Sequence, residues 1–189
     1  MFGFFRRKRT PQLEAEWLVV GLGNPGAKYA ATRHNVGYMA LDELAGELTP
    51  VPGIKALVQV RDGVAFARST TYMNTTGEAV GPLAAQLGVA PEQVIVIHDE
   101  LDLPAGTVRL KFGGNENGHN GLKSITEHIG TRDYVRVRIG IGRPPAGVAV
   151  PDWVLGPVSG DERIDLAAEA ARLVVAEGLA KAQNVIHAR

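Results

Sequence analysis

Cysteine is absent from the 189-residue chain, and serine occurs only as Ser69, Ser124 and Ser159. Without a thiol the chain forms no disulfide, iron–sulfur centre or Cys-containing zinc site, and it has no thiolate nucleophile. None of the serines lies in the G-x-S-x-G pattern that exposes the nucleophile of α/β-hydrolases. A hydrolase of this composition therefore has to activate water directly.

Long hydrophobic runs are also missing, because no uninterrupted apolar segment approaches the ~18 residues of a membrane span. At the start of the chain an apolar segment precedes the basic run Arg6–Arg9, which reverses the order of a secretory signal. We therefore expect no membrane insertion, no secretion and a cytoplasmic location.

Neither charge is in excess, since 20 Lys and Arg balance 20 Asp and Glu. The balance conceals two basic segments: residues 1–10 hold four basic and no acidic residues, and residues 103–143 hold seven basic and three acidic. Each segment is either a phosphate-binding surface or ordinary solvated charge.

The hydrophobic pattern predicts one α/β domain with a basic, flexible tail at residues 1–16. We expect strands at residues 17–20, 56–60, 64–67, 94–97, 107–112 and 134–141. We expect helices from Val36 to near Pro50, from Thr75 or Thr76 to Gly88, from Leu122 to Ile129, and over Ile164 to Val175. Asp62-Gly63 predicts a hairpin turn. The fold class is α/β: a three-layer single domain, with a mixed, mostly parallel central sheet flanked by helices.

The first strand ends in Gly21-Leu22-Gly23-Asn24-Pro25-Gly26, which satisfies the dinucleotide-binding pattern G-x-G-x-x-G. A true fingerprint needs a helix at once and an acidic residue at the end of a second strand about 20 residues on. Pro25 stiffens the loop, and the nearest acidic candidate, Glu47, falls in an expected helix. A turn that forms the floor of a site is the better interpretation, and a nucleotide-dependent oxidoreductase is a weaker alternative.

Histidine is the natural general base near neutral pH. His34 follows the glycine-rich loop, and His98-Asp99 closes an apolar strand whose carboxyl end lines the expected crevice. A carboxylate there can orient an imidazole. A metal site over His98–Asp102 is the alternative, weakened because adjacent strand residues point to opposite faces. His128 and His187 are expected at the surface.

Amide side chains gather in two places, at Asn74 and in the loop that ends at Asn120. Such side chains hold a water, grip a peptide carbonyl or cap a helix, and capping is the alternative for Asn120. Lys111 and Lys123 flank this loop, so the segment is a candidate phosphate cradle.

Five blocks in order resemble the bacterial-type peptidyl-tRNA hydrolases, from about Trp17 to the C-terminal helix. They are Gly21–Gly26 with Tyr29 and Thr32–Gly37, Thr71–Asn74, His98–Pro104, Gly118–Ile125 and Arg138–Pro144. Residues 17–189 are thus expected to be a peptidyl-tRNA hydrolase-like catalytic domain.

The resemblance implies a metal-independent, cofactor-free esterase that cleaves the ester between a peptide and tRNA. It implies His34 as the base, Asp99 as its orienting partner and Asn24 as the residue that senses N-acylation. It also implies that Tyr29, Tyr72, Asn74 and Asn120 contact the tRNA end or the peptide, with Met73 lining the site. The expected partner is peptidyl-tRNA, bound at its 3′ acceptor end and its phosphates, the latter by Lys111 and Lys123. We expect a monomer and no membrane partner.

The chain departs from the family pattern at three places. The stretch from Glu47 to Ser69 is short, Arg68-Ser69 stands where Lys-Pro is expected, and Asn117 stands where a glycine is usual. A non-catalytic RNA-binding protein of the same fold is the alternative function, and the presence of both His34 and Asp99 favours catalysis.

Overall fold

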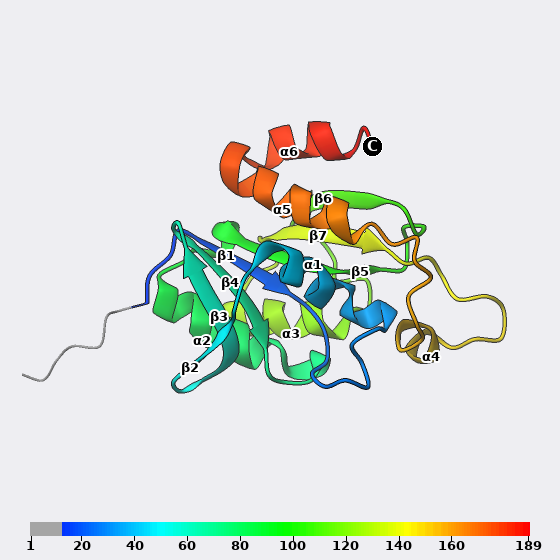
Figure 1. Cartoon of the computed structure of the whole chain (residues 1–189), viewed down its shortest axis with the longest axis horizontal. Helices are drawn as coiled ribbons and strands as arrows, with labels where there is room; N and C mark the ends of the chain where they lie inside the picture. The colour runs from blue at the N-terminus through cyan, green and yellow to red at the C-terminus, as the bar shows by residue number, and fades with distance from the viewer. Residues whose placement is uncertain (1–12) are drawn as a thin grey trace, which may run out of the picture.

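A computed structural model describes residues 13–189, which form one mixed sheet between two layers of helices (Figure 1). The sheet has seven strands in the order β2-β3-β4-β1-β5-β7-β6. The strands are β1 (Trp17–Gly21), β2 (Thr49–Val51), β3 (Ile54–Arg61), β4 (Val64–Ser69), β5 (Val94–Glu100), β6 (Val108–Phe112) and β7 (Val135–Gly140).

The four central strands, β4, β1, β5 and β7, run parallel, and antiparallel strands flank them on both sides. β5 is buried along its whole length, as expected of a continuous apolar run covered on both faces. The predicted three-layer α/β fold with a mixed sheet is confirmed.

Helices cover both faces of the sheet. They are α1 (Val36–Leu44), α2 (Gly77–Leu87), α3 (Asn120–Ile129), α4 (Val150–Val154), α5 (Ile164–Glu177) and α6 (Leu179–Ile186). Alternate residues of each strand feed two cores: Val19, Ile95 and Ile97 pack with α1 and α5, whereas Val20 and Val96 pack with α2 and α3. α6 lies beside the edge strand β6, where Gln183 Nε2 donates to the Leu110 carbonyl and His187 Nε2 accepts from the Leu110 N–H.

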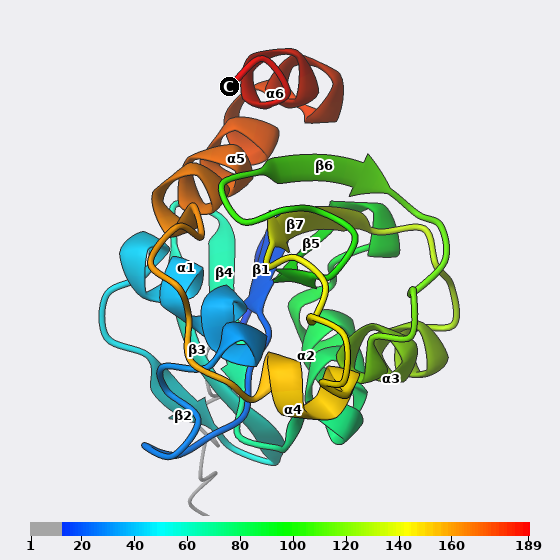
Figure 2. The ribbon, with the colours of Figure 1, turned by 90° about the vertical axis from the view of Figure 1, so that its right-hand side faces the viewer.

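The carboxyl ends of β1, β4 and β5 face the same side of the molecule, which Figure 2 turns toward the viewer together with α4. Short 3-10 helices follow two of them: η1 (Arg33–Asn35) after the glycine-rich loop and η2 (Met73–Thr75) after β4. Ligands of open α/β sheets bind at such an edge.

The predicted strands, the hairpin turn and the helices α2, α3 and α5 are present, and three details are wrong. The first helix ends at Leu44 rather than near Pro50, because the chain turns extended at Ala45 and Pro50 lies in the edge strand β2. Thr76 precedes α2 but does not cap it: its hydroxyl donates back to the Met73 carbonyl. β2, α4 and α6 were not predicted from the pattern, since each is short or weakly periodic.

Residues 1–12 of the expected tail lie outside the described residues, and Leu13 and Ala15 pack against the core. The Ala15 and Glu16 N–H groups donate to the carbonyls of Leu87 and Gly63. None of the helices in residues 13–189 combines the length and apolar content needed to cross a membrane.

Candidate active site

A cleft of about 720 Å³ opens at the carboxyl edge of the sheet. Five segments line it: the loop after β1 with η1, the start of η2, the end of β5, the loop before α3 and the segment around α4. The cleft collects most of the predicted site residues, namely Asn24, Tyr29, His34, Tyr72, Met73, Asn74, Asp99 and Asn120.

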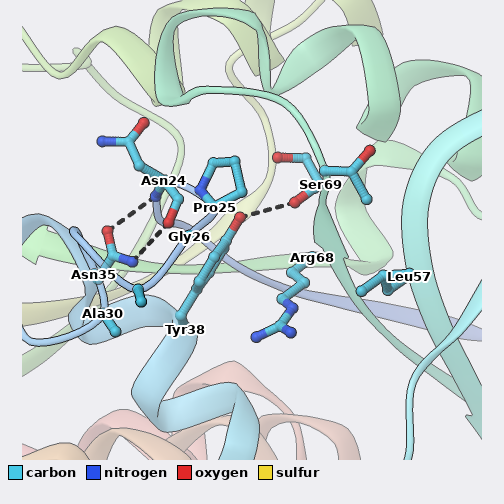
Figure 3. Close-up of a pocket in the computed structure, with 11 residues that line it drawn as sticks. Asn24, Pro25, Gly26, Ala30, Asn35, Tyr38, Leu57, Arg68 and Ser69 are labelled. Atoms are coloured by element: carbon cyan, nitrogen blue, oxygen red, sulfur yellow. Dashed lines mark hydrogen bonds between the residues drawn. The ribbon is translucent and has the colours of Figure 1, made fainter.

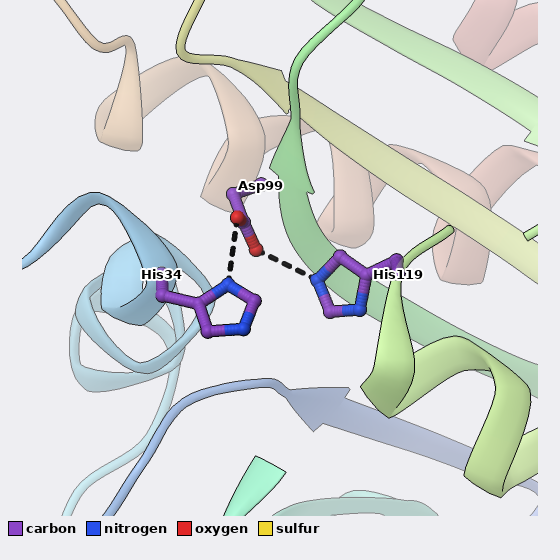
Figure 4. Close-up of side chains that lie close together, drawn as sticks. All are labelled: His34, Asp99 and His119. Carbon is purple, nitrogen blue, oxygen red and sulfur yellow. Dashed lines mark hydrogen bonds and ion pairs between the residues drawn. The ribbon is translucent and has the colours of Figure 1, made fainter. Parts of the chain in front are cut away.

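Asp99 lies between two imidazoles (Figure 4). His34 Nδ1 donates to Asp99 Oδ2 over 2.8 Å, and His119 Nε2 donates to Asp99 Oδ1 over 2.8 Å. A carboxylate only accepts, so both nitrogens facing it carry a proton. The Nε2 atom of His34 is then unprotonated, and its lone pair remains available as a proton acceptor.

His119 is fixed by the start of α3. Its Nδ1 accepts from the N–H groups of Gly121 and Leu122 at 3.1 and 3.4 Å, so the imidazole, and not Asn120, is the N-cap. This capping leaves Nδ1 without a proton and places the proton on Nε2, toward Asp99. The capping alternative for Asn120 is therefore wrong, and its exposed amide lines the cleft.

The charges of the pair follow from this geometry. Burial disfavours the charged His34, but the charge of Asp99 and its hydrogen bond outweigh burial and raise the pKa of His34 above 6.5. Burial likewise disfavours the charged Asp99, but His34 and His119 lower the pKa of this carboxyl well below its ordinary value. Asp99 therefore stays ionised while His34 titrates.

His98 lies behind this group and does not enter the cleft. Its Nδ1 donates to the Asp99 carbonyl over 2.8 Å, and burial, followed by the nearby His119, lowers the pKa of His98 to about 3. The residues His98–Asp102 do not converge, so the metal site considered over them is wrong. The cluster whose ligand atoms lie within 4.8 Å of one another is His34, Asp99 and His119, and its two 2.8 Å contacts are those of proton-bridged pairs.

Two glycines bring His34 to Asp99. A Cβ on Gly37 would lie 2.3 Å from the Ile97 carbonyl oxygen, and one on Gly21 would lie 2.3 Å from the Gly37 oxygen. The start of α1 thus rests directly on the ends of β1 and β5. The loop from Gly21 to Gly26 leads into this contact and no helix follows it before Arg33, so it is not a dinucleotide fingerprint.

Arg33 ties η1 to the α4 segment. Its guanidinium stacks 3.5 Å from the centroid of the Trp153 ring and donates to the Trp153 carbonyl, while its backbone N–H donates to the Gly156 carbonyl. The indole Nε1 donates in turn to the Gly142 carbonyl. The segment that forms one wall of the cleft is therefore joined to the residue beside His34.

Asn24 is held so that only its amide NH₂ is free. Its Oδ1 accepts from the Met73 N–H over 2.7 Å, and its backbone N–H and carbonyl are both bonded to the Asn35 side chain at 2.9 Å. Because the oxygen is used, the side chain presents Nδ2 as a donor.

The remaining predicted residues divide into two groups. Tyr29 and the exposed Tyr72 form an edge-to-face pair with centroids 6.3 Å apart, beside Met73 and Asn74. Lys111 on β6 and Lys123 on α3 lie outside the cleft.

Sequence reasoning did not single out His119 or the opposite wall of the cleft. That wall includes Glu100, Asn117 and Arg143, and an apolar part formed by Val150, Pro151, Val154 and Leu155. The position of His119 directly before the α3 pattern was an available signal, because that is where a capping residue stands.

The chain matches the family model described as peptidyl-tRNA hydrolase over residues 18–189. A protein of Corynebacterium glutamicum named peptidyl-tRNA hydrolase 2 is 65% identical over 187 residues, covering 95% of this chain and 92% of its own. A peptidyl-tRNA hydrolase of Mycobacterium sp. (strain KMS) is 49% identical, covering 90% and 96%. The crystal structure of peptidyl-tRNA hydrolase from Acinetobacter baumannii superposes with a TM-score of 0.82 at 37% identity, covering 94% and 97%.

Proposed function

Because the chain belongs to the peptidyl-tRNA hydrolase family and is an enzyme of that kind, we propose that His34 activates the water that cleaves the peptidyl-tRNA ester. The observation that carries this proposal is the contact of 2.8 Å between His34 Nδ1 and Asp99 Oδ2, which leaves His34 Nε2 as the proton acceptor in the cleft. With no cysteine and no serine elbow in the chain, water is the nucleophile.

In the first step, His34 Nε2 takes a proton from water and the resulting hydroxide adds to the ester carbon. The tetrahedral oxyanion then collapses, the bond to the 3′-oxygen of the tRNA ribose breaks, and His34 returns its proton to that oxygen. The products are a peptide carboxylate and tRNA with a free hydroxyl. Asp99 stabilises the imidazolium that exists between the two steps, and His119 holds the second oxygen of Asp99.

Asn24 supplies the selection for N-acylated substrates. Its free Nδ2 donates to a carbonyl oxygen, and the amide of a peptidyl group provides one where a free aminoacyl group has an ammonium, which only donates. An ammonium facing Nδ2 would be desolvated without an acceptor, which is costly. Acylated esters are therefore favoured.

We assign the tRNA end to Tyr29, Tyr72, Asn74 and Asn120, whose rings and amides border the cleft. Aromatic faces stack on unpaired bases, as at the single-stranded 3′ end of tRNA. Lys111 and Lys123 meet phosphates beyond the cleft.

The test compares one tRNA that carries either an N-acetylated or a free aminoacyl ester, with and without EDTA. We expect rapid cleavage of the acylated ester, much slower cleavage of the free one, and no effect of EDTA. Loss of activity with EDTA would replace His34 by a metal-bound water as the nucleophile's source. Binding without cleavage would indicate a non-catalytic RNA-binding protein.

A further inference from the structure

A second cavity, of about 280 Å³, lies beside the catalytic cleft (Figure 3). Pro25, Ala27 and Ala30 form one side, Leu57, Ser69 and Thr70 the other, and the Tyr38 ring and Arg68 lie between them. Its volume is near the lower end of the ~300–1,000 Å³ range of ligand pockets. Tyr38 is fixed in place because its hydroxyl donates to the Ser69 carbonyl over 2.8 Å.

The second cavity adjoins the catalytic cleft through Asn24, which lines both. The same two loops form both cavities: the loop after β1 gives Ala27 and Ala30 to the second cavity and Tyr29 to the cleft. The loop after β4 gives Ser69 and Thr70 to the second cavity and Tyr72 to the cleft. A chain bound in the cleft therefore reaches the second cavity by passing Asn24.

Arg68 is the one charged side chain that lines the second cavity. Its guanidinium lies 5.1 Å from the centroid of the Tyr38 ring, and its ionic partner among residues 13–189 is the exposed Asp42, at 3.8 Å. A contact of that length to an exposed carboxylate leaves most of the guanidinium donors free, and exposed pairs of this kind are weak.

We propose that the second cavity binds the residue that precedes the esterified residue of the peptide, with Arg68 favouring an acidic side chain there. This proposal rests on the proposed function. Asn24 Nδ2 donates to the carbonyl of that preceding residue, and the second cavity is the space directly beyond Asn24. The apolar walls cover the aliphatic part of the side chain, and Arg68 pairs with its carboxylate.

The position along the sheet favours the peptide over RNA as the occupant. The second cavity lies over β4 and β3, through Arg68, Ser69 and Leu57, whereas Lys111 and Lys123 belong to β6 and α3, on the other side of β1. The acyl and alcohol parts of an ester diverge from its carbonyl carbon, so a tRNA directed toward the lysines leaves the β4 side to the peptide.

The experiment uses the full chain and three forms of one tRNA, which carry N-acetyl-X, N-acetyl-Glu-X or N-acetyl-Lys-X with the same residue X. We expect the wild type to cleave the Glu form with a kcat/KM about tenfold above the Lys form, the scale of one hydrogen bond to a charged group. R68Q should abolish this preference and leave the N-acetyl-X form unchanged, and R68K should retain part of it. Lys55→Gln is the matched control, since Lys55 is a cation on the same side that pairs with Glu78 and lines neither cavity.

Ala30→Leu provides a second variant, which narrows the cavity from an exposed position and should lower kcat/KM for both dipeptidyl forms only. Equal cleavage of the Glu and Lys forms by the wild type would overturn the proposal. An equal loss on all three substrates in R68Q would also overturn it and assign Arg68 to tRNA. Failure of the wild type to cleave N-acetyl-X-tRNA would instead contradict the proposed function itself.

Discussion

At the scale of single residues, the arrangement around Asp99 separates two histidines by role. His119 gives its Nδ1 to the helix cap and its Nε2 proton to Asp99, so both nitrogens are used within the fold. His34 uses only Nδ1. Of the two imidazoles bonded to Asp99, His34 alone has a nitrogen available for catalysis.

The pH dependence of kcat/KM tests this assignment. His34 acts as a base only when unprotonated, and its pKa is raised above 6.5, so activity should fall as the pH drops through that raised pKa. Asp99→Asn removes the charge that raises the pKa and leaves burial, which lowers it. The acid limb should therefore move to lower pH while the plateau drops about 10²–10⁴-fold. An acid limb in the same place in Asp99→Asn would contradict the pairing.

Asn24→Asp should narrow the preference for acylated esters. One carboxylate oxygen keeps the bond to the Met73 N–H, and the other gives an ammonium its acceptor and opposite charge. We expect kcat/KM to fall for the acylated ester and to rise for the free one, measured on the same tRNA. Asn24→Ala is the control, and it should lower the acylated rate without raising the other.

At the scale of secondary structure, the start of α3 serves both stability and catalysis. His119→Ala removes the cap of α3 and should lower the free energy of unfolding by about 1 kcal/mol. His119→Asn restores a capping oxygen but not the bond to Asp99. It should therefore recover the melting temperature while its kcat stays low. Recovery of both together would mean that His119 acts only as a cap.

The contact of α1 with the sheet is equally specific. Gly37→Ala places a methyl group 2.3 Å from the Ile97 carbonyl oxygen, and overpacking of this kind costs about 1–3 kcal/mol. We expect a lower melting temperature and a lower kcat, because η1 carries His34 directly before α1. Glu43→Ala, on the exposed side of the same helix, should change neither.

At the scale of the whole molecule, the sequence predicts what depends on local patterns. The buried strand ending in His98-Asp99 and the glycine-rich loop before His34 indicated a crevice at the sheet edge, and the structure brings His34 and Asp99 together there. The role of His119 was not predictable, because its tautomer depends on a helix cap and a carboxylate 20 residues away. The α4 wall was missed for a similar reason: Arg33 and Trp153 are 120 residues apart in the chain.

Binding of tRNA should depend on the basic segment 103–143. If Lys111 and Lys123 meet phosphates, replacing both with Gln should flatten the slope of log affinity against log salt by less than one counterion per contact. KM should then rise more than kcat falls. Lys181→Gln, whose ammonium pairs with Glu177 away from the cleft, is the control and should leave the slope unchanged.

The central claim is that His34 is the base, and single-turnover hydrolysis of N-acetyl-aminoacyl-tRNA by His34→Ala tests it most directly. With enzyme in excess and tRNA binding measured in parallel, the chemical step is observed apart from substrate capture. The account predicts a dissociation constant close to that of the wild type and a cleavage rate lower by at least about 10²–10⁴-fold. Cleavage by His34→Ala at nearly the wild-type rate would contradict it.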